Sequence, residues 1–267
     1  MLEIEWVLSF LLLGSFIGFM AGLLGIGGGG IMVPVLTSIF LQQGVPIENV
    51  VHLALGTSMA SIIITSISSL RAHNAKGGVI WDVVKRMAPG IIIGALLATF
   101  LVSLLSSIYL AIFFALFMAY ISLQMFLNKK PKPSRGLAGG VGLFVTGSGI
   151  GAISALVSIG GGSLTVPYLT WQNVDVKKAI GTSAAIGFPL SIAGTLGYLI
   201  NGWDSSSAQD LIFGYVYLPA VLLISTTSFF TAPYGARLAH KLPVVALKKI
   251  FSLLLIALSI KMLISIV

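Results

Sequence analysis

Two glycine-rich stretches are the places where the backbone of this chain is best suited to bind a ligand. The first, Leu23–Pro34, reads LLGIGGGGIMVP, and the second, Val157–Pro167, reads VSIGGGSLTVP. Glycine costs about 1 kcal/mol relative to alanine inside a helix, so each run is expected to break a helix. The helix that follows then begins with unpaired N–H groups at the positive end of its dipole, and two such ends facing each other would bind an anion. The predicted backbone donors are Gly27, Gly28, Gly29, Gly30, Gly160, Gly161, Gly162 and Ser163.

A Gly-Thr-Ser triplet recurs at residues 56–58 and 181–183, in the apolar segment after each glycine run. A hydroxyl is a neutral donor to an oxyanion, and the recurrence favours a role at a shared site. The same hydroxyls could instead donate to the carbonyl four residues earlier in their own helix, and both interpretations stay open. The side chains predicted to contact the anion are Thr57, Ser58, Thr182 and Ser183.

The carboxylates avoid the apolar segments. All seven lie in loops or at segment edges, namely Glu3, Glu5, Glu48, Asp82, Asp175, Asp204 and Asp210. Proton and cation relays usually use an Asp, Glu or His inside the membrane, whereas a core without acids does not repel an anion. His52, near the start of an apolar segment, is the candidate for proton coupling, although a histidine at an interface often has no such role.

Close helix packing and nucleotide binding could also account for runs of glycine. Small residues let helices pack closely, and Gly14, Gly18 and Gly22 already have the small-xxx-small spacing. That packing does not explain four consecutive glycines followed by Pro34. The spacing Gly25-x-Gly27-x-x-Gly30 also fits a dinucleotide fingerprint, but its flanks are apolar segments without a βαβ pattern, so we reject it. With no cysteine in the chain, Cys-ligated metals are excluded, and we predict no cofactor, no metal and no catalytic residue.

Composition indicates a polytopic α-helical membrane protein, which we expect in the inner membrane. The 267 residues are 57% hydrophobic and only 8% charged, with a mean hydropathy of +1.07, whereas soluble domains carry about 25% charged residues. Several apolar runs approach the ~20 residues that span a bilayer. The basic residues behind the net charge of +8 lie in short loops, where they indicate orientation and not binding to nucleic acid. The expected partners are the lipid bilayer, a small anionic substrate and a coupling proton or ion, and the oligomeric state is left open.

The chain divides into two similar halves. Residues 1–127 are predicted to form a first transmembrane repeat, residues 128–136 a cytoplasmic basic linker, and residues 137–267 a second repeat. The glycine runs align with each other, as do the two Gly-Thr-Ser triplets, and Pro89 aligns with Pro219.

Loop charges predict that the two repeats are inverted relative to each other. The basic loop Arg71–Arg86 corresponds to Asn201–Asp210, which carries only acids, and the neutral turn near Ser106 corresponds to the basic stretch Arg237–Lys249. By the positive-inside rule, matched loops then face opposite sides. Inverted halves require an odd number of membrane crossings in each half. Three transmembrane helices and one hairpin, which turns at the glycine run within the membrane and returns to its own side, meet this requirement. The chain then has about 8–10 membrane segments. Both termini are then outside, and every Lys and Arg except Lys261 is inside.

The doubled motif resembles the sulfite exporter TauE/SafE family of membrane transporters. The resemblance rests on GLLGIGGGGIMVPVL and SALVSIGGGSLTVPYL, on both Gly-Thr-Ser triplets, and on the run from Gly214 to Pro243, and it covers essentially the whole chain. The loop Arg71–Arg86, with Gly78 and Trp81, also looks like the family's Arg…Gly…Trp loop. The resemblance implies an integral membrane permease for sulfite, sulfonates, sulfoacetate or related organosulfur anions.

The leading hypothesis is a secondary transporter that exports a small sulfur oxyanion or sulfonate by alternating access, an architecture in which inverted repeats and discontinuous helices recur. An anion channel with the same glycine-lined site remains the alternative. An intramembrane enzyme, such as a serine protease, is a remote third class. It needs a His or Lys base within reach of a buried Ser, and the apolar segments contain no His or Lys in mid-span except Lys261, which is near the end of its segment.

Overall fold

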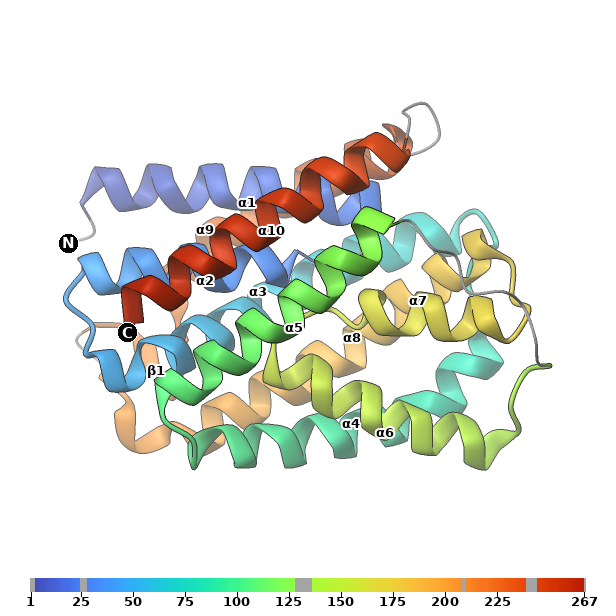
Figure 1. Ribbon diagram of the computed structural model, residues 1–267, viewed down its shortest axis with the longest axis horizontal. Helices are drawn as coiled ribbons and strands as arrows, with labels where there is room; N and C mark the ends of the chain where they lie inside the picture. Colours follow the sequence, from blue (N-terminus) through green and yellow to red (C-terminus); the bar gives the residue numbers. More distant parts are fainter. Residues whose placement is uncertain (1–2, 25–27, 128–135, 208–209, 239–243, 267) are drawn as a thin grey trace.

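The chain folds into a bundle of α-helices whose long axis lies horizontal in Figure 1. The computed structural model describes residues 3–24, 28–127, 136–207, 210–238 and 244–266. The first half contains α1 (Ile4–Leu24), α2 (Gly29–Gln42), α3 (Ile47–Asn74), α4 (Trp81–Ser103) and α5 (Ser107–Leu127). The second half contains α6 (Gly140–Leu156), α7 (Gly162–Trp171), α8 (Val176–Asn201), η1 (Trp203–Ser205), β1 (Ile212–Phe213), β2 (Val216–Tyr217), α9 (Leu218–Leu238) and α10 (Val244–Ile266).

The helices confirm a polytopic all-α membrane protein. Within the described residues, six helices are long and apolar enough to cross a membrane: α1, α3, α4, α5, α8 and α10. Large apolar side chains face outward on these helices, including Leu97 on α4 and Leu116 on α5, which are exposed as expected for a lipid-facing surface. The predicted linker, residues 128–136, lies outside the described residues except for Gly136.

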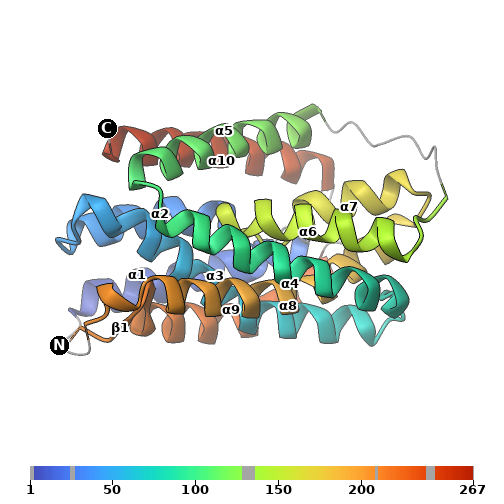
Figure 2. The same ribbon diagram turned by 90° about the horizontal axis from the view of Figure 1, so that it is seen from below.

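The central pair of the bundle is α3 and α8, which pack against each other. In α3, 83% of the membrane-length window is buried, against 33% in α5 and in α10. Helices α5 and α10 lie side by side at one edge of the bundle (Figure 2). Both Gly-Thr-Ser triplets therefore lie on the two helices that form the core, and not on the lipid-facing layer.

Helix contacts recur in pairs between the two halves. Helix α1 packs on α9 and α6 packs on α4, while α3 contacts α9 and α8 contacts α4. If α1 to α5 are matched in order with α6 to α10, each of these contacts has its counterpart in the other half. The short helices follow the same rule, because α2 packs on α3 and α7 packs on α8.

Glycines allow the closest of these approaches. A Cβ added at Gly14 or Gly18 of α1 would overlap the hydroxyls of Thr227 and Thr231 on α9, respectively. Between α4 and α6, a Cβ on Gly94 would overlap the backbone carbonyl of Ser148. Close packing is thus confirmed as the role of Gly14 and Gly18, as expected for helices that associate in lipid through small residues.

The two ends of the bundle differ in charge. The described ends of the chain, the loop of residues 43–46 and the turn of residues 104–106 lie at the left of Figure 1, together with the β1–β2 hairpin. The loops of residues 75–80 and 172–175 lie at the right. The left end carries Glu48, Asp204 and Asp210. At the right end, Asp82 and Asp175 are outnumbered by the basic residues Lys76, Lys85, Arg86, Lys177 and Lys178.

The apolar run from Leu211 to Ala232 is not helical throughout. Its first residues form the β1–β2 hairpin, in which Ile212 pairs with Tyr217 and Phe213 with Val216. Gly214 turns this hairpin with a φ of 55°, a left-handed conformation that glycine adopts without steric cost. Helix α9 therefore begins only at Leu218.

Candidate functional site

Both glycine runs interrupt a helix. Helix α1 ends at Leu24 and α2 begins at Gly29, while α6 ends at Leu156 and α7 begins at Gly162. The residue before each short helix is a left-handed glycine, Gly28 with φ 72° and Gly161 with φ 75°. Residues with a side chain pay a steric cost in this conformation, which explains why glycine is needed at both positions. Gly27, the remaining predicted donor of the first run, lies outside the described residues.

The two breaks touch each other in the interior of the bundle. Gly29 lies against the backbone carbonyl of Ser158, and a Cβ added to Gly29 would overlap that carbonyl. The carbonyl oxygen of Gly160 lies 3.1 Å from the position of a Cβ on Gly187 of α8. Ser158 is completely buried and donates from Oγ to the carbonyl of Leu55 on α3 over 2.9 Å. The structure therefore brings the two predicted breaks together beside the central helix pair.

The first amides of each short helix have no partner among the described residues. At α2, the N–H groups of Ile31 and Met32 both donate to the carbonyl of Gly28, and the amides of Gly29 and Gly30 donate to no described residue; residues 25–27, just before this turn, lie outside the described residues. At α7, the N–H groups of Leu164 and Thr165 both donate to the carbonyl of Gly161. Among the described residues, the amides of Gly29, Gly30, Gly162 and Ser163 have no acceptor, as is expected for the first N–H groups of a helix.

The threonines of the two triplets have equivalent partners. The backbone N–H of Tyr217 donates to Thr57 Oγ1 over 3.0 Å, and the carbonyl of Tyr215 lies against Gly56, where a Cβ would overlap it. In the other half, the backbone N–H of Ile80 donates to Thr182 Oγ1, also over 3.0 Å.

The glycine of the second triplet repeats the same contact, because a Cβ on Gly181 would overlap the carbonyl of Gly78. Each glycine thus admits a chain segment, and each threonine holds that segment by its backbone. We call these the hairpin segment, residues 211–217, and the loop segment, residues 75–80.

The structure does not bring the two triplets into one site. On the antiparallel pair α3–α8, Met59 lies against Gly194 and Ser66 against Gly187. In this register, Thr182 lies beside the right-end part of α3, whereas Thr57 belongs to the left-end part. The two threonines are therefore roughly 20 Å apart along the helix axis, at 1.5 Å per residue. The hairpin segment lies at the left end of the bundle and the loop segment at the right end (Figure 1).

The serines of the triplets are buried without a partner. Ser58 and Ser183 have exposed fractions of 0% and 1%, and neither hydroxyl has a hydrogen-bond partner in the described part of the chain. The bond to the carbonyl four residues earlier does occur nearby, where Ser61 donates to Thr57. It is made neither by Ser58 nor by Ser183, so their hydroxyls are available to a ligand.

His52 lies near the left end of α3, against the end of α4. Its Nε2 is 3.1 Å from the carbonyl oxygen of Val102 and 3.0 Å from that of Leu105, so Nε2 carries a proton that it donates to them. Its Nδ1 is 3.4 Å from Ser107 Oγ, and Ser107 itself donates to the carbonyl of Glu48. The Ser107 hydroxyl is thus committed to a backbone carbonyl and is not a nucleophile activated by His52.

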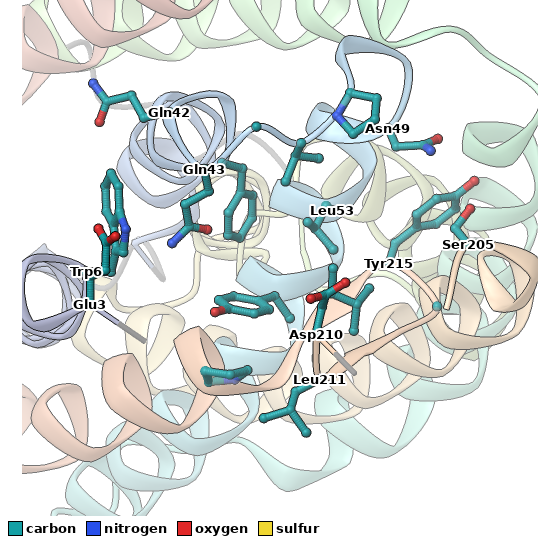
Figure 3. Close-up of a pocket in the computed structure, with 18 residues that line it drawn as sticks. Glu3, Trp6, Gln42, Gln43, Asn49, Leu53, Ser205, Asp210, Leu211 and Tyr215 are labelled. Carbon is teal, nitrogen blue, oxygen red and sulfur yellow. The ribbon is translucent and has the colours of Figure 1, made fainter. Parts of the chain in front are cut away.

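A pocket of about 720 Å³ opens at the left end, beside the hairpin segment (Figure 3). Figure 3 shows Asp210 and Gln43 directed toward its centre, with Trp6 and Glu3 on one side and Tyr215 on the other. The described lining contains two carboxylates and no Lys or Arg, and the glycines of the two breaks are not part of it.

Tyr217 connects this pocket to the first triplet. Its ring packs against Phe40 at a centroid distance of 5.7 Å and against Phe10 at 6.2 Å, and its backbone N–H is held by Thr57. Burial, and then the nearby Asp210 carboxylate, raise the pKa of the Tyr217 hydroxyl, so the phenol stays protonated. Tyr217 thus lies both in the wall of the pocket and beside the first triplet.

Comparison with known proteins supplies the family. A model of the family described as sulfite exporter TauE/SafE matches residues 10–262. A probable membrane transporter protein of Haemophilus influenzae is 38% identical over 258 residues, which are 96% of this chain and 98% of the relative.

Two more distant relatives carry similar names. A probable membrane transporter protein of Methanocaldococcus jannaschii is 27% identical, covering 90% of each chain. The probable membrane transporter protein YdhB of Bacillus subtilis is 26% identical, covering 87% of this chain and 90% of its own. No solved structure matches the chain significantly. The family model matches nearly the whole chain, and the relatives are named as transporters, not as enzymes. The chain therefore belongs to the sulfite exporter TauE/SafE family of membrane transporters.

Proposed function

We propose that this protein exports a small sulfur oxyanion or organic sulfonate across the inner membrane as a secondary transporter. The family description names sulfite, and the described apolar spans carry no carboxylate in their buried interior. The observation that carries the proposal is the contact between the two helix breaks, where Gly29 lies against Ser158. The amides that have no acceptor within the described part of the chain, at both breaks, suit a ligand with negative oxygens.

The substrate site that we propose is centred on the two breaks. The amides of the glycine runs and of Ser163 act as backbone donors, and the unpaired hydroxyls of Ser58 and Ser183 receive the anion as it enters or leaves. Thr57 and Thr182 are proposed to act at the two ends of the anion's path and not at its centre, where they hold the hairpin segment and the loop segment. Because each threonine holds one segment at one end, alternate release of the two segments would give access from one side at a time.

The proposed topology is a pair of inverted repeats, residues 1–127 and 137–267, joined by a cytoplasmic linker. Its support is the pairwise recurrence of helix contacts between the halves, together with the acidic left end and the basic right end of the bundle. By the positive-inside rule, the right end then faces the cytoplasm and both termini lie outside.

The function is tested by anion flux into proteoliposomes that contain the purified protein. Sulfite and methanesulfonate should enter in a saturable manner, and preloaded unlabelled anion should accelerate uptake of labelled anion by counterflow. Single-channel currents without counterflow would instead identify an anion channel. Absence of flux for both anions would refute the proposed substrate class.

The topology is testable because the chain contains no cysteine. A single cysteine at Ser106, in the left-end turn, is expected to react with a membrane-impermeant thiol reagent in intact cells. A single cysteine at Ala75, in the right-end loop, is expected to react only after the membrane is permeabilised. Both positions are exposed, so reaction of Ala75→Cys in intact cells would contradict the orientation.

We propose His52 as the group through which transport is coupled to protons. Its ring lies 4.9 Å from that of Tyr215, which lines the pocket, so a change in its charge would be felt there. The His52→Gln variant is expected to transport with a flat pH profile between pH 5 and 8, the range in which histidine titrates. His73→Gln, at the other end of α3, serves as the control, and an unchanged pH profile in His52→Gln would remove His52 from coupling.

A further inference from the structure

The break before α7 differs from the break before α2 in its side chains. Three hydroxyl groups near the second break have no hydrogen-bond partner in the described part of the chain: Ser154, Ser163 and Thr165. When the two motifs are aligned on Pro34 and Pro167, the corresponding residues of the first break are Ala21, Gly30 and Met32. None of these three has a side-chain donor.

Thr165 is the best placed of these hydroxyls. It has an exposed fraction of 0%, and its Oγ1 lies 3.7 Å from the position of a Cβ on Gly161, the left-handed residue at the break. Its backbone N–H already donates to the carbonyl of Gly161 over 2.8 Å, which fixes the residue in the first turn of the ten-residue helix α7. A buried donor without a partner is costly in a folded protein and calls for a ligand or an ordered water.

The first break offers a different surface. Gly30 faces side chains of other helices, with Met118 Sδ and Leu255 Cδ2 each 3.0 Å from the position of its Cβ. Met32, the counterpart of Thr165, is completely buried. The first break therefore contributes close backbone approach and an apolar wall, while the second contributes side-chain donors beside the free amides of Gly162 and Ser163.

We infer that the anion is bound asymmetrically, at the N-terminus of α7, with the hydroxyls of Thr165 and Ser163 as side-chain donors. This inference rests on the proposed function and adds Thr165 as a specificity-determining residue. Hydroxyl and amide donors without a cationic side chain favour an oxyanion such as sulfite or a sulfonate, whose oxygens accept several hydrogen bonds at once. Chloride, which has no oxygen acceptors in fixed directions, gains less from this arrangement.

The test measures anion binding by the purified full-length protein through its thermal stability, since a ligand that binds the folded state raises the melting temperature. The probes are sodium sulfite and sodium methanesulfonate, with sodium chloride at equal ionic strength as the reference. Thr165→Val removes the hydroxyl with little change of shape and is expected to weaken binding about tenfold or more, because hydrogen bonds to charged groups are among the stronger ones. Thr165→Ser, which keeps the hydroxyl, should bind as the wild type does.

Thr37→Val is the matched control. Thr37 is also completely buried, has an unpaired hydroxyl and lies in the short helix of the other half, but it is about 12 Å along α2 from Gly29 at 1.5 Å per residue. The inference is supported if only Thr165→Val loses binding, and it is overturned if Thr165→Val binds both anions as tightly as the wild type. If Thr165→Val does not fold, Ser163→Ala is expected to weaken binding, and unchanged binding in that variant overturns the inference.

The same experiment separates this inference from the function on which it rests. A wild-type protein that binds and transports the anions, together with a Thr165→Val variant that binds them equally well, refutes the asymmetric site alone. A wild-type protein that neither binds nor transports either anion refutes the proposed substrate class.

Discussion

Anion flux is expected to fall about tenfold to a hundredfold when Gly29 is replaced by valine. The new side chain would overlap the backbone carbonyl of Ser158, and a carbonyl cannot turn aside as a flexible side chain can. Overpacking of this kind costs about 1–3 kcal/mol, and each 1.4 kcal/mol is tenfold in an equilibrium constant. Because the overlap separates the two breaks, the cost falls on the arrangement proposed to bind the anion. Flux in proteoliposomes, normalised to the amount of folded protein, measures the effect.

The control for this variant is Gly149→Val. Gly149 is also a helical glycine, on α6, but a Cβ at this position meets no atom within 4 Å. The Gly149→Val variant makes the same change in helix propensity without the steric overlap, so its anion flux is expected to remain close to that of the wild type. If Gly29→Val transports as well as Gly149→Val, the contact between the breaks has no part in transport.

Removing the hydroxyl of Thr57 or of Thr182 is expected to open opposite ends of the protein. Thr57→Val leaves the backbone N–H of Tyr217 without its acceptor, and Thr182→Val does the same to Ile80. An unsatisfied buried N–H costs about 1–3 kcal/mol, so release of the affected segment becomes about fivefold to a hundredfold more frequent. The change should therefore appear as faster access of solvent at one end only.

The measurement uses a cysteine at Ser58 as a reporter for the left end and a cysteine at Ser183 for the right end. In Thr57→Val, a thiol reagent should modify Ser58→Cys faster and Ser183→Cys at the unchanged rate, and in Thr182→Val the reverse should hold. Thr57→Ser and Thr182→Ser keep the hydroxyl and are the controls. Equal acceleration of both reporters in either valine variant would show general loosening and would contradict separate control of the two ends.

The helix breaks were predictable because they depend on a local property of the chain. A run of glycines before a proline is unfavourable in a helix wherever it lies, so the ends of α1 and α6 follow from the residues themselves. Helix ends are less predictable, because α3 and α4 include polar residues near their ends, such as Asn74 and Asp82, that an apolar pattern does not mark as helical. The β1–β2 hairpin was missed because its residues are as apolar as those of the helix after it.

The partners of the site residues were not predictable in this way. Tyr217 is 160 residues from Thr57, and Ile80 is 102 residues from Thr182, so no local pattern connects them. The triplet indicated that Gly56 and Thr57 act together, but the chain segment that they hold appears only when the helices are packed. Thr165 resembles an ordinary residue of an apolar helix, and only the packed structure shows that its hydroxyl is buried beside the break without a partner.

The pocket at the left end also determines the electric field that an ion meets there. Glu3 and Asp210 line it, and the described lining contains no cation to offset them. An anion that approaches from this end is repelled over a range of about 8 Å at physiological ionic strength and over longer distances in dilute salt, whereas one that arrives through the protein is driven out by the same charges. For the export that we propose, these two carboxylates therefore slow the return of the anion by electrostatic repulsion, without any closure of the pocket.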